Sequence, residues 1–188
     1  MNKVISKDGT SIAYEVSGKG NPLILVDGAL CSRSFGPMKK LSSLLAKDFT
    51  VLTYDRRGRG ESTDNKPYAV QREVEDIEAL INEAGGSAYV YGISSGAALA
   101  LKAAENKLNI PKMALYEPPY IREKNNPADF ETELNKLIAS GRRSDAVKYF
   151  MTTMVGLPAF FGFIMQLIRA LLFFVLLPTS LSAPRATA

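Results

Sequence analysis

Residues 88–104 read AYVYGISSGAALALKAA, and this stretch decides the fold. It opens with a short apolar run of the kind found in strands that are buried on both faces. Glycines and serines follow at positions 92–96, and the sequence from Ser95 to Ala104 is rich in alanine. Alanine favours a helix and lets that helix pack close to a sheet. The stretch therefore predicts a strand, a tight turn and a helix in direct succession.

The sequence on either side repeats this alternation. Three further apolar runs have the form of a buried strand: Leu23–Val26, Val51–Tyr54 and Met113–Tyr116. Apolar residues that recur with a period of about 3.6 residues predict helices from Met38 to Leu45 and from Val70 to Ala84. The second of these carries Glu73, Glu75, Asp76 and Glu78 on its other side. With a hairpin at Val4–Ser6 and Ser11–Val16, the pattern predicts an α/β fold, a mostly parallel sheet with helices on both faces.

The composition changes towards the C-terminus. Two more helices are expected, one with Asn126 as its cap and Pro127 in its first turn, the other capped by Ser144. Residues 149–188 then contain Arg169 and Arg185 as their only charged residues. We therefore expect two parts, a folded domain at 1–155 and an apolar tail at 156–188.

Overall composition excludes several classes of function. The 188 residues are 46% hydrophobic with a net charge of +4, and acidic and basic residues are interleaved, so no nucleic-acid partner is predicted. Cys31 is the only cysteine, and the N-terminal residues do not have the pattern of a secretory signal. The expected compartment is therefore the cytoplasm. The sequence has no phosphate-binding glycine motif and no multi-cysteine metal site, so neither a cofactor nor a metal is predicted. It also contains no histidine, so it cannot supply an imidazole base.

The turn at 92–96 carries the chemistry. Gly92-Ile93-Ser94-Ser95-Gly96 matches G-x-S-x-G between a strand and a helix, the setting of a nucleophile elbow. Such a turn holds the serine in a strained conformation with its hydroxyl exposed, and the amide of Ser95 at the helix N-terminus could bind a developing oxyanion. Gly92 and Gly96 lack side chains where strand and helix approach closely. The alternative is an ordinary Gly-Ser turn.

Three landmarks together resemble the α/β-hydrolase superfamily, of the single-domain esterase, lactonase and cofactor-free haloperoxidase type. They are Leu25-Val26-Asp27-Gly28-Ala29, where the family commonly has His-Gly, the loop from Tyr54 to Ser62, which resembles D-x-R-G-x-G-x-S, and the turn at 92–96. The resemblance covers approximately residues 3–155. It implies that Ser94 is the nucleophile and that the backbone amides of Ala29 and Ser95 form the oxyanion hole. The implied substrate is a small ester, lactone or similar acyl compound.

The sequence departs from the family in its C-terminal part. Such enzymes place an acid and then a histidine on loops after later strands. This chain lacks those strands and has no histidine, so we expect impaired activity and a truncated or frameshifted end. Two other classes of function stay open: a non-catalytic fragment, and a protein anchored in the membrane through residues 159–177.

Other candidate residues are weaker. Glu117 ends a predicted strand, where some members of the superfamily place the triad acid, although a structural carboxylate before Pro118 is the simpler interpretation. Cys31 is expected to be a buried structural thiol. Arg56, Arg57 and Arg59 are expected on a surface loop that braces the sheet, with anion binding as the alternative. The apolar strand at Met113–Tyr116 would form a sheet edge, so association through this edge is predicted.

Overall fold

The computed structural model describes residues 1–120 and 129–158. The chain divides into two compact units, Met1–Tyr120 and Ile121–Ala188, which are described separately. The division at 155 that composition suggests stays a prediction, because residues 159–188 lie outside the described part.

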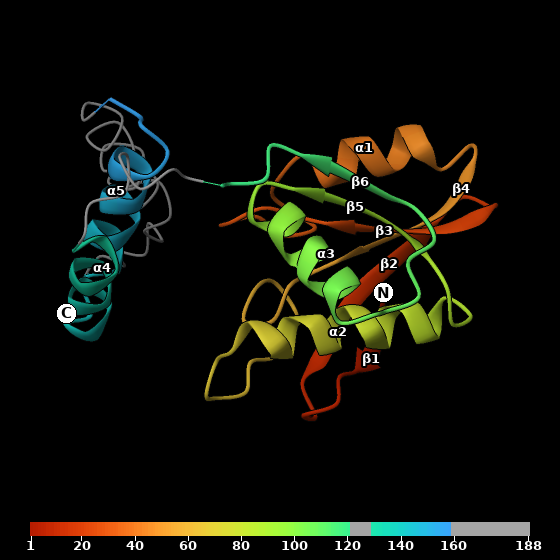
Figure 1. The fold of residues 1–188 in the computed structure, drawn as a ribbon, viewed down its shortest axis with the longest axis horizontal. Coiled ribbons are helices and arrows are strands. Elements are labelled where there is room, and N and C mark those ends of the chain that lie inside the picture. Colours follow the sequence, from red (N-terminus) through yellow and green to blue (C-terminus); the bar gives the residue numbers. More distant parts are fainter. Residues whose placement is uncertain (121–128, 159–188) are drawn as a thin grey trace, which may run out of the picture. The chain divides into compact units, whose positions relative to one another are not determined.

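The first unit is built on one sheet (Figure 1). In the described residues its strands run in the order β1-β2-β4-β3-β5-β6. The first two pair antiparallel with each other, β2 also runs antiparallel to β4, and β4, β3, β5 and β6 are parallel to one another. The strands are β1 (Asn2–Ile5), β2 (Ser11–Ser17), β3 (Asn21–Val26), β4 (Phe49–Tyr54), β5 (Tyr89–Ile93) and β6 (Met113–Tyr116). The predicted runs and hairpin are confirmed to within a few residues at each end.

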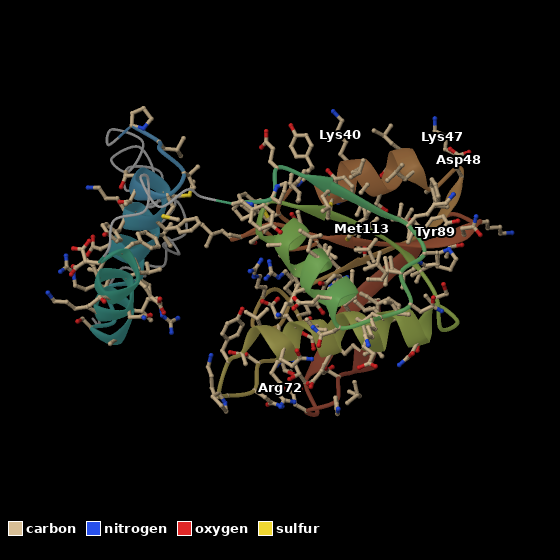
Figure 2. The ribbon with its side chains drawn as sticks, in the orientation of Figure 1. Lys40, Lys47, Asp48, Arg72, Tyr89 and Met113 are labelled. Atoms are coloured by element: carbon tan, nitrogen blue, oxygen red, sulfur yellow. The ribbon has the colours of Figure 1, made fainter. Side chains whose placement is uncertain are left out.

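Helices cover both faces of this sheet, as predicted. Connections between parallel strands are right-handed, so helices on connections that run in opposite directions across the sheet lie on opposite faces. Thus α1 (Met38–Leu45), between β3 and β4, covers one face, whereas α2 (Val70–Glu83) and α3 (Ser95–Glu105) cover the other (Figure 1). Leu23 and Leu25 of β3 belong to the core under α1, and the alternating residues Ile24 and Val26 belong to the core under α2 and α3. Lys40 points from α1 away from the sheet (Figure 2).

The acidic residues of α2 differ from expectation. A polar helix face normally lies in solvent. Glu73, Glu75 and Asp76 are nevertheless buried, and only Glu78 of the four is exposed. Glu73 and Asp76 are buried because arginine side chains from the loop after β4 pair with them.

The second unit contains two described helices, α4 (Phe130–Ala139) and α5 (Arg143–Thr153). Gly141 has a φ of +72° after α4, as a helix-ending glycine does. The ring of Phe130 stacks on that of Tyr149, with 5.3 Å between their centroids. The sequence predicts Ser144 as the N-cap of α5, but the N-cap is Arg142, two residues earlier, and the helix begins at Arg143. The predicted Asn126 and Pro127 lie outside the described residues.

No helix within the described ranges is long and apolar enough to cross a bilayer. The predicted span at 159–177 lies outside those ranges.

Candidate active site

The carboxyl ends of the parallel strands bring the candidate residues to one edge of the sheet. Asp27 follows β3, Asp55 follows β4, Ser94 follows β5 and Glu117 follows β6. Sites in open α/β sheets form at this edge, where neighbouring connections leave the sheet in opposite directions. Here β3 and β5 are neighbours, and the helices that follow them, α1 and α3, cover opposite faces of the sheet.

Ser94 has an unusual backbone at the turn from β5 to α3. Its φ is 52° and its ψ is −124°, a combination that residues with a side chain rarely adopt. Such conformations cost of order 1–3 kcal/mol and persist only where the surroundings enforce them. The Ser94 side chain makes no capping hydrogen bond to α3, and the residue is half-buried. Its hydroxyl is therefore not committed to the helix terminus.

The two glycines of the motif lie where there is no room for a side chain. A Cβ on Gly96 would collide with the carbonyl oxygen of Val26 and would lie 2.6 Å from that of Asp27. A Cβ on Gly92 would lie 2.6 Å from the carbonyl oxygen of Gly96. The absence of both side chains lets the start of α3 lie directly against the ends of β3 and β5.

The loop after β3 lies beside Ser94. A Cβ built on Gly28 would lie 3.4 Å from the Cβ of Ser94, so loop and turn are in van der Waals range. Ala29, whose amide the family resemblance assigns to the oxyanion hole, is the next residue and is half-buried. Leu30 has a positive φ of 61°. The loop therefore turns sharply just beyond the candidate donor.

Asp27 carries a buried carboxyl group in this loop. The residue is 3% exposed, its Oδ1 accepts the amide of Gly28 at 2.8 Å, and its carboxyl group also interacts with the thiol of Cys31. Burial raises the pKa of this carboxyl group above its ordinary value. Burial also raises the pKa of the half-buried Cys31 thiol, and the nearby Asp27 carboxylate adds to that effect. The raised pKa makes Cys31 a poor nucleophile near neutral pH.

Two of the three arginines are buried rather than on the surface, which corrects the expectation from sequence. Arg56 and Arg57 are each 6% exposed. Arg57 forms ion pairs with Asp76 and Asp8, at 2.7 and 2.8 Å. These pairs tie the loop after β4 to α2 and to the β1–β2 turn, so the predicted bracing is present but internal.

The third arginine of this cluster, Arg59, holds the loop after β3. Its Nη1 donates to the carbonyl oxygens of Gly28 and Cys31, at 2.7 and 3.3 Å. These bonds fix the loop on both sides of Ala29.

The structure brings the predicted residues to one edge of the sheet, and Glu117 directly follows Tyr116, whose carbonyl oxygen accepts the amide of Ser94 at 2.9 Å. Ser94, Ser95, Gly92 and Gly96 form one turn, with Ala29 on the adjacent loop. Glu117 lies at the end of β6 with an exposed side chain and a φ of 47°. Within residues 1–120 and 129–158, no three Asp, Glu, Cys or His side chains are grouped closely enough to hold a metal ion.

Sequence reasoning missed the link from Arg56 to this turn. Arg56 bonds the hydroxyl of Ser95 at 3.0 Å and forms an ion pair with Glu73 at 2.6 Å. The sequence did contain one indication that Glu73 is buried. This residue lies next to Val74 and near Ile77, which are both buried core residues of α2.

Comparison with known proteins supplies the family. The sequence model of the alpha/beta hydrolase family matches residues 23–186, most of the chain and beyond the boundary at 155. The chain belongs to the alpha/beta hydrolase family. The predicted superfamily and fold class are thereby confirmed.

Three individual proteins are similar over between 48% and 88% of this chain. The uncharacterized hydrolase YraK of Bacillus subtilis (strain 168) is 33% identical over 104 residues, 53% of this chain and 38% of YraK. The putative non-heme bromoperoxidase BpoC of Mycobacterium tuberculosis is 30% identical over 92 residues, 48% of this chain and 35% of BpoC. The crystal structure of an alpha/beta hydrolase from Sphaerobacter thermophilus DSM 20745 shares 50% identity with a TM-score of 0.81, over 88% of this chain and 65% of that one. The chain thus spans less than two thirds of the length of each of these relatives.

Proposed function

We propose that this member of the alpha/beta hydrolase family carries the nucleophile and the oxyanion hole of a serine hydrolase that cleaves a small ester, lactone or similar acyl compound. The observation that carries the proposal is the backbone of Ser94, strained at φ 52° and ψ −124° in the turn from β5 to α3. Strain of this size is retained where it serves a purpose, and here it sets apart a hydroxyl group that makes no capping bond to its own helix.

In the proposed reaction the Oγ of Ser94 attacks the acyl carbon. The new O–C bond forms as the carbonyl becomes an oxyanion, which the amides of Ala29 and Ser95 stabilise. Collapse of this intermediate breaks the bond to the alcohol, which leaves with a proton, and water then hydrolyses the acyl-enzyme. The N-terminus of α3 contributes a positive dipole end at the same place.

The proton of the Ser94 hydroxyl needs an acceptor, and these 188 residues contain no histidine to accept it. We therefore propose that the chain by itself reacts slowly, with hydroxide or a buffer base taking the proton. Without a complete triad, serine hydrolases retain about 10³–10⁴-fold acceleration over water from the oxyanion hole and binding.

A second candidate is a non-catalytic protein that retains the hydrolase fold. The absence of histidine from the sequence favours it, because an unassisted serine hydroxyl is a weak nucleophile. The two candidates differ in one property, the reactivity of Ser94.

Labelling by a fluorophosphonate tests the choice. The reagent forms a bond from Oγ to phosphorus and releases fluoride, so mass spectrometry of the peptide spanning 92–101 reports the reaction. We expect slow labelling of Ser94 that rises with pH, is accelerated by added imidazole and is lost in Ser94→Ala. A folded protein that does not label at pH 9, even with imidazole, would support the non-catalytic candidate instead.

A further inference from the structure

One nitrogen atom of Arg56 bonds both sides of the candidate oxyanion hole. Its Nη1 donates to the carbonyl oxygen of Asp27 at 3.2 Å and to the hydroxyl of Ser95 at 3.0 Å. Asp27 begins the loop that carries Ala29, and the amide of Ser95 is the second candidate donor. A single guanidinium group thus connects Asp27 and Ser95, which are 68 positions apart in the sequence.

The rest of this guanidinium group is held rigidly. Nε donates to Oε2 of Glu73 at 2.6 Å and Nη2 to Oε1 at 2.7 Å, a bidentate pair. The hydroxyl of Tyr68 donates to the same Oε1 at 2.9 Å. Although burial alone would raise the pKa of Glu73, the hydrogen bonds from Arg56 hold it below its ordinary value. The pair therefore stays charged, and its planar geometry fixes where Nη1 points.

We propose that Arg56 is a positioning residue that sets the separation and orientation of the two oxyanion-hole amides, those of Ala29 and Ser95. This inference rests on the proposed function of Ser94. Oxyanion donors act when they are held in advance at 2.7–3.1 Å from the developing charge, and a displacement of about 1 Å can cost about 100-fold in rate. A side chain that bonds both supports restricts their relative displacement.

The chain offers a matched control one residue away. Arg57 is equally buried and also forms a bidentate pair with an acid of α2, Asp76. Its other hydrogen bonds go to Asp8 and to the carbonyl of Arg72, so within the described residues it bonds neither Ser95 nor the loop after β3. An effect on stability alone should follow the loss of either arginine, whereas an effect on the oxyanion hole should follow only the loss of Arg56.

The experiment compares Arg56→Lys and Arg57→Lys in the full-length chain. Lysine keeps the charge but cannot bond Glu73 and Ser95 together in a planar fork. Saturation kinetics of fluorophosphonate labelling separate reagent binding (KI) from bond formation (kinact). We expect kinact to fall about tenfold to 100-fold in Arg56→Lys, with KI unchanged within about twofold, and to stay near wild type in Arg57→Lys at a comparable loss of melting temperature. An equal effect of the two variants, or an unchanged kinact in Arg56→Lys, would overturn the inference.

A second variant covers the case in which Arg56→Lys does not fold. Ser95→Ala removes only the hydroxyl that Arg56 bonds and leaves the ion pair with Glu73 intact. It should lower kinact several-fold, and an unchanged value would contradict the proposed role.

Amide hydrogen exchange separates this inference from the proposed function. If the wild type does not label at all, the proposed function fails, but the exchange of peptides spanning 27–31 and 94–97 still reports how firmly the two segments are held. Both should exchange faster in Arg56→Lys than in Arg57→Lys under conditions of equal global stability. Equal exchange would show that Arg56 does not position these segments.

Discussion

The backbone amide of Ser94 donates a hydrogen bond to the carbonyl oxygen of Tyr116, 2.9 Å away. Tyr116 is the last residue of β6, and β6 is an edge strand among the described residues. On the other side of the turn, the carbonyl of Ser94 accepts the amide of Ala97 at 2.9 Å. The unusual conformation of Ser94 is therefore fixed by bonds from both its amide and its carbonyl, and its stability depends on the strand at the sheet edge.

This strain predicts that Ser94→Gly stabilises the protein. Glycine adopts a positive φ without a Cβ clash, so relief of strain should exceed the added entropy of the unfolded chain and raise the free energy of unfolding by about 1 kcal/mol. Ser94→Ala keeps the Cβ and should change stability by less than about 0.5 kcal/mol. Urea unfolding of the three proteins measures the difference. Equal stability of Ser94→Gly and Ser94→Ala would mean that the turn stores no strain at this residue.

The close approach at Gly96 predicts a severe effect of a single methyl group. Gly96→Ala would drive a Cβ into the backbone of β3 and should cost at least about 3 kcal/mol, because a strand backbone cannot move aside as a side chain can. Gly28→Ala is the control, since its new Cβ would lie 3.4 Å from the nearest atom and Gly28 has no positive φ. It should cost no more than about 1 kcal/mol. Thermal unfolding with circular dichroism compares the two variants.

The strands and the candidate nucleophile could be predicted from sequence because they rest on local patterns. The run at 88–91, the glycines of the turn and the alanines after Ser95 are adjacent in the chain, and the structure has β5 and α3 at those positions. The burial of Arg56 and Arg57 could not be predicted in the same way. Charged side chains are seldom buried unless paired, and their partners, Glu73, Asp76 and Asp8, lie 17 to 49 positions away.

The prediction that Ser144 is the N-cap of α5 was wrong for a different reason. Ser144 suits an N-cap by residue type, but the chain already turns at Gly141, and α5 begins at Arg143. The preference for serine at a cap is worth about 1 kcal/mol, which a neighbouring tight turn can outweigh.

The buried carboxyl group of Asp27 predicts a pH-dependent effect. Because its pKa is raised in the folded state, the folded protein binds more protons than the unfolded one between the two pKa values, and stability is lost as pH rises through the folded pKa. Asp27→Asn removes the charge and keeps an acceptor for the amide of Gly28. The variant should be more stable than wild type by about 1 kcal/mol at pH 8, with a difference that shrinks towards pH 4.

Calorimetry of both proteins from pH 4 to pH 8 measures this difference, and a constant difference over that range would contradict the assignment. The Cys31 thiol gives a second readout. The Asp27 carboxylate contributes to the raised pKa of this thiol, so Asp27→Asn should make Cys31 react faster with a maleimide at pH 8.

The edge strand β6 predicts association of the chain. Met113 is 36% exposed and Tyr116 51% exposed, and Ala114 between them is also exposed. Tyr89 on β5 and Met113 on β6 lie near the starts of these neighbouring strands (Figure 2). In the described residues no strand pairs with the outer side of β6, so its backbone groups and apolar side chains are open to another chain. We therefore expect the 188-residue chain to sediment as a dimer or larger species.

A lysine in this edge should weaken that association. Ala114→Lys places a charge that would have to be buried in any strand-to-strand contact, which is how natural edge strands avoid pairing. Val16→Lys is the control, because Val16 is exposed on β2, an internal strand of the sheet. Analytical ultracentrifugation should show Ala114→Lys shifted towards monomer and Val16→Lys unchanged. A wild type that is already monomeric at 100 µM would contradict the prediction. An equal shift in both variants would also contradict it, because both substitutions add the same charge but only Ala114→Lys adds it where strands can pair. Association would then depend on net charge rather than on the edge strand.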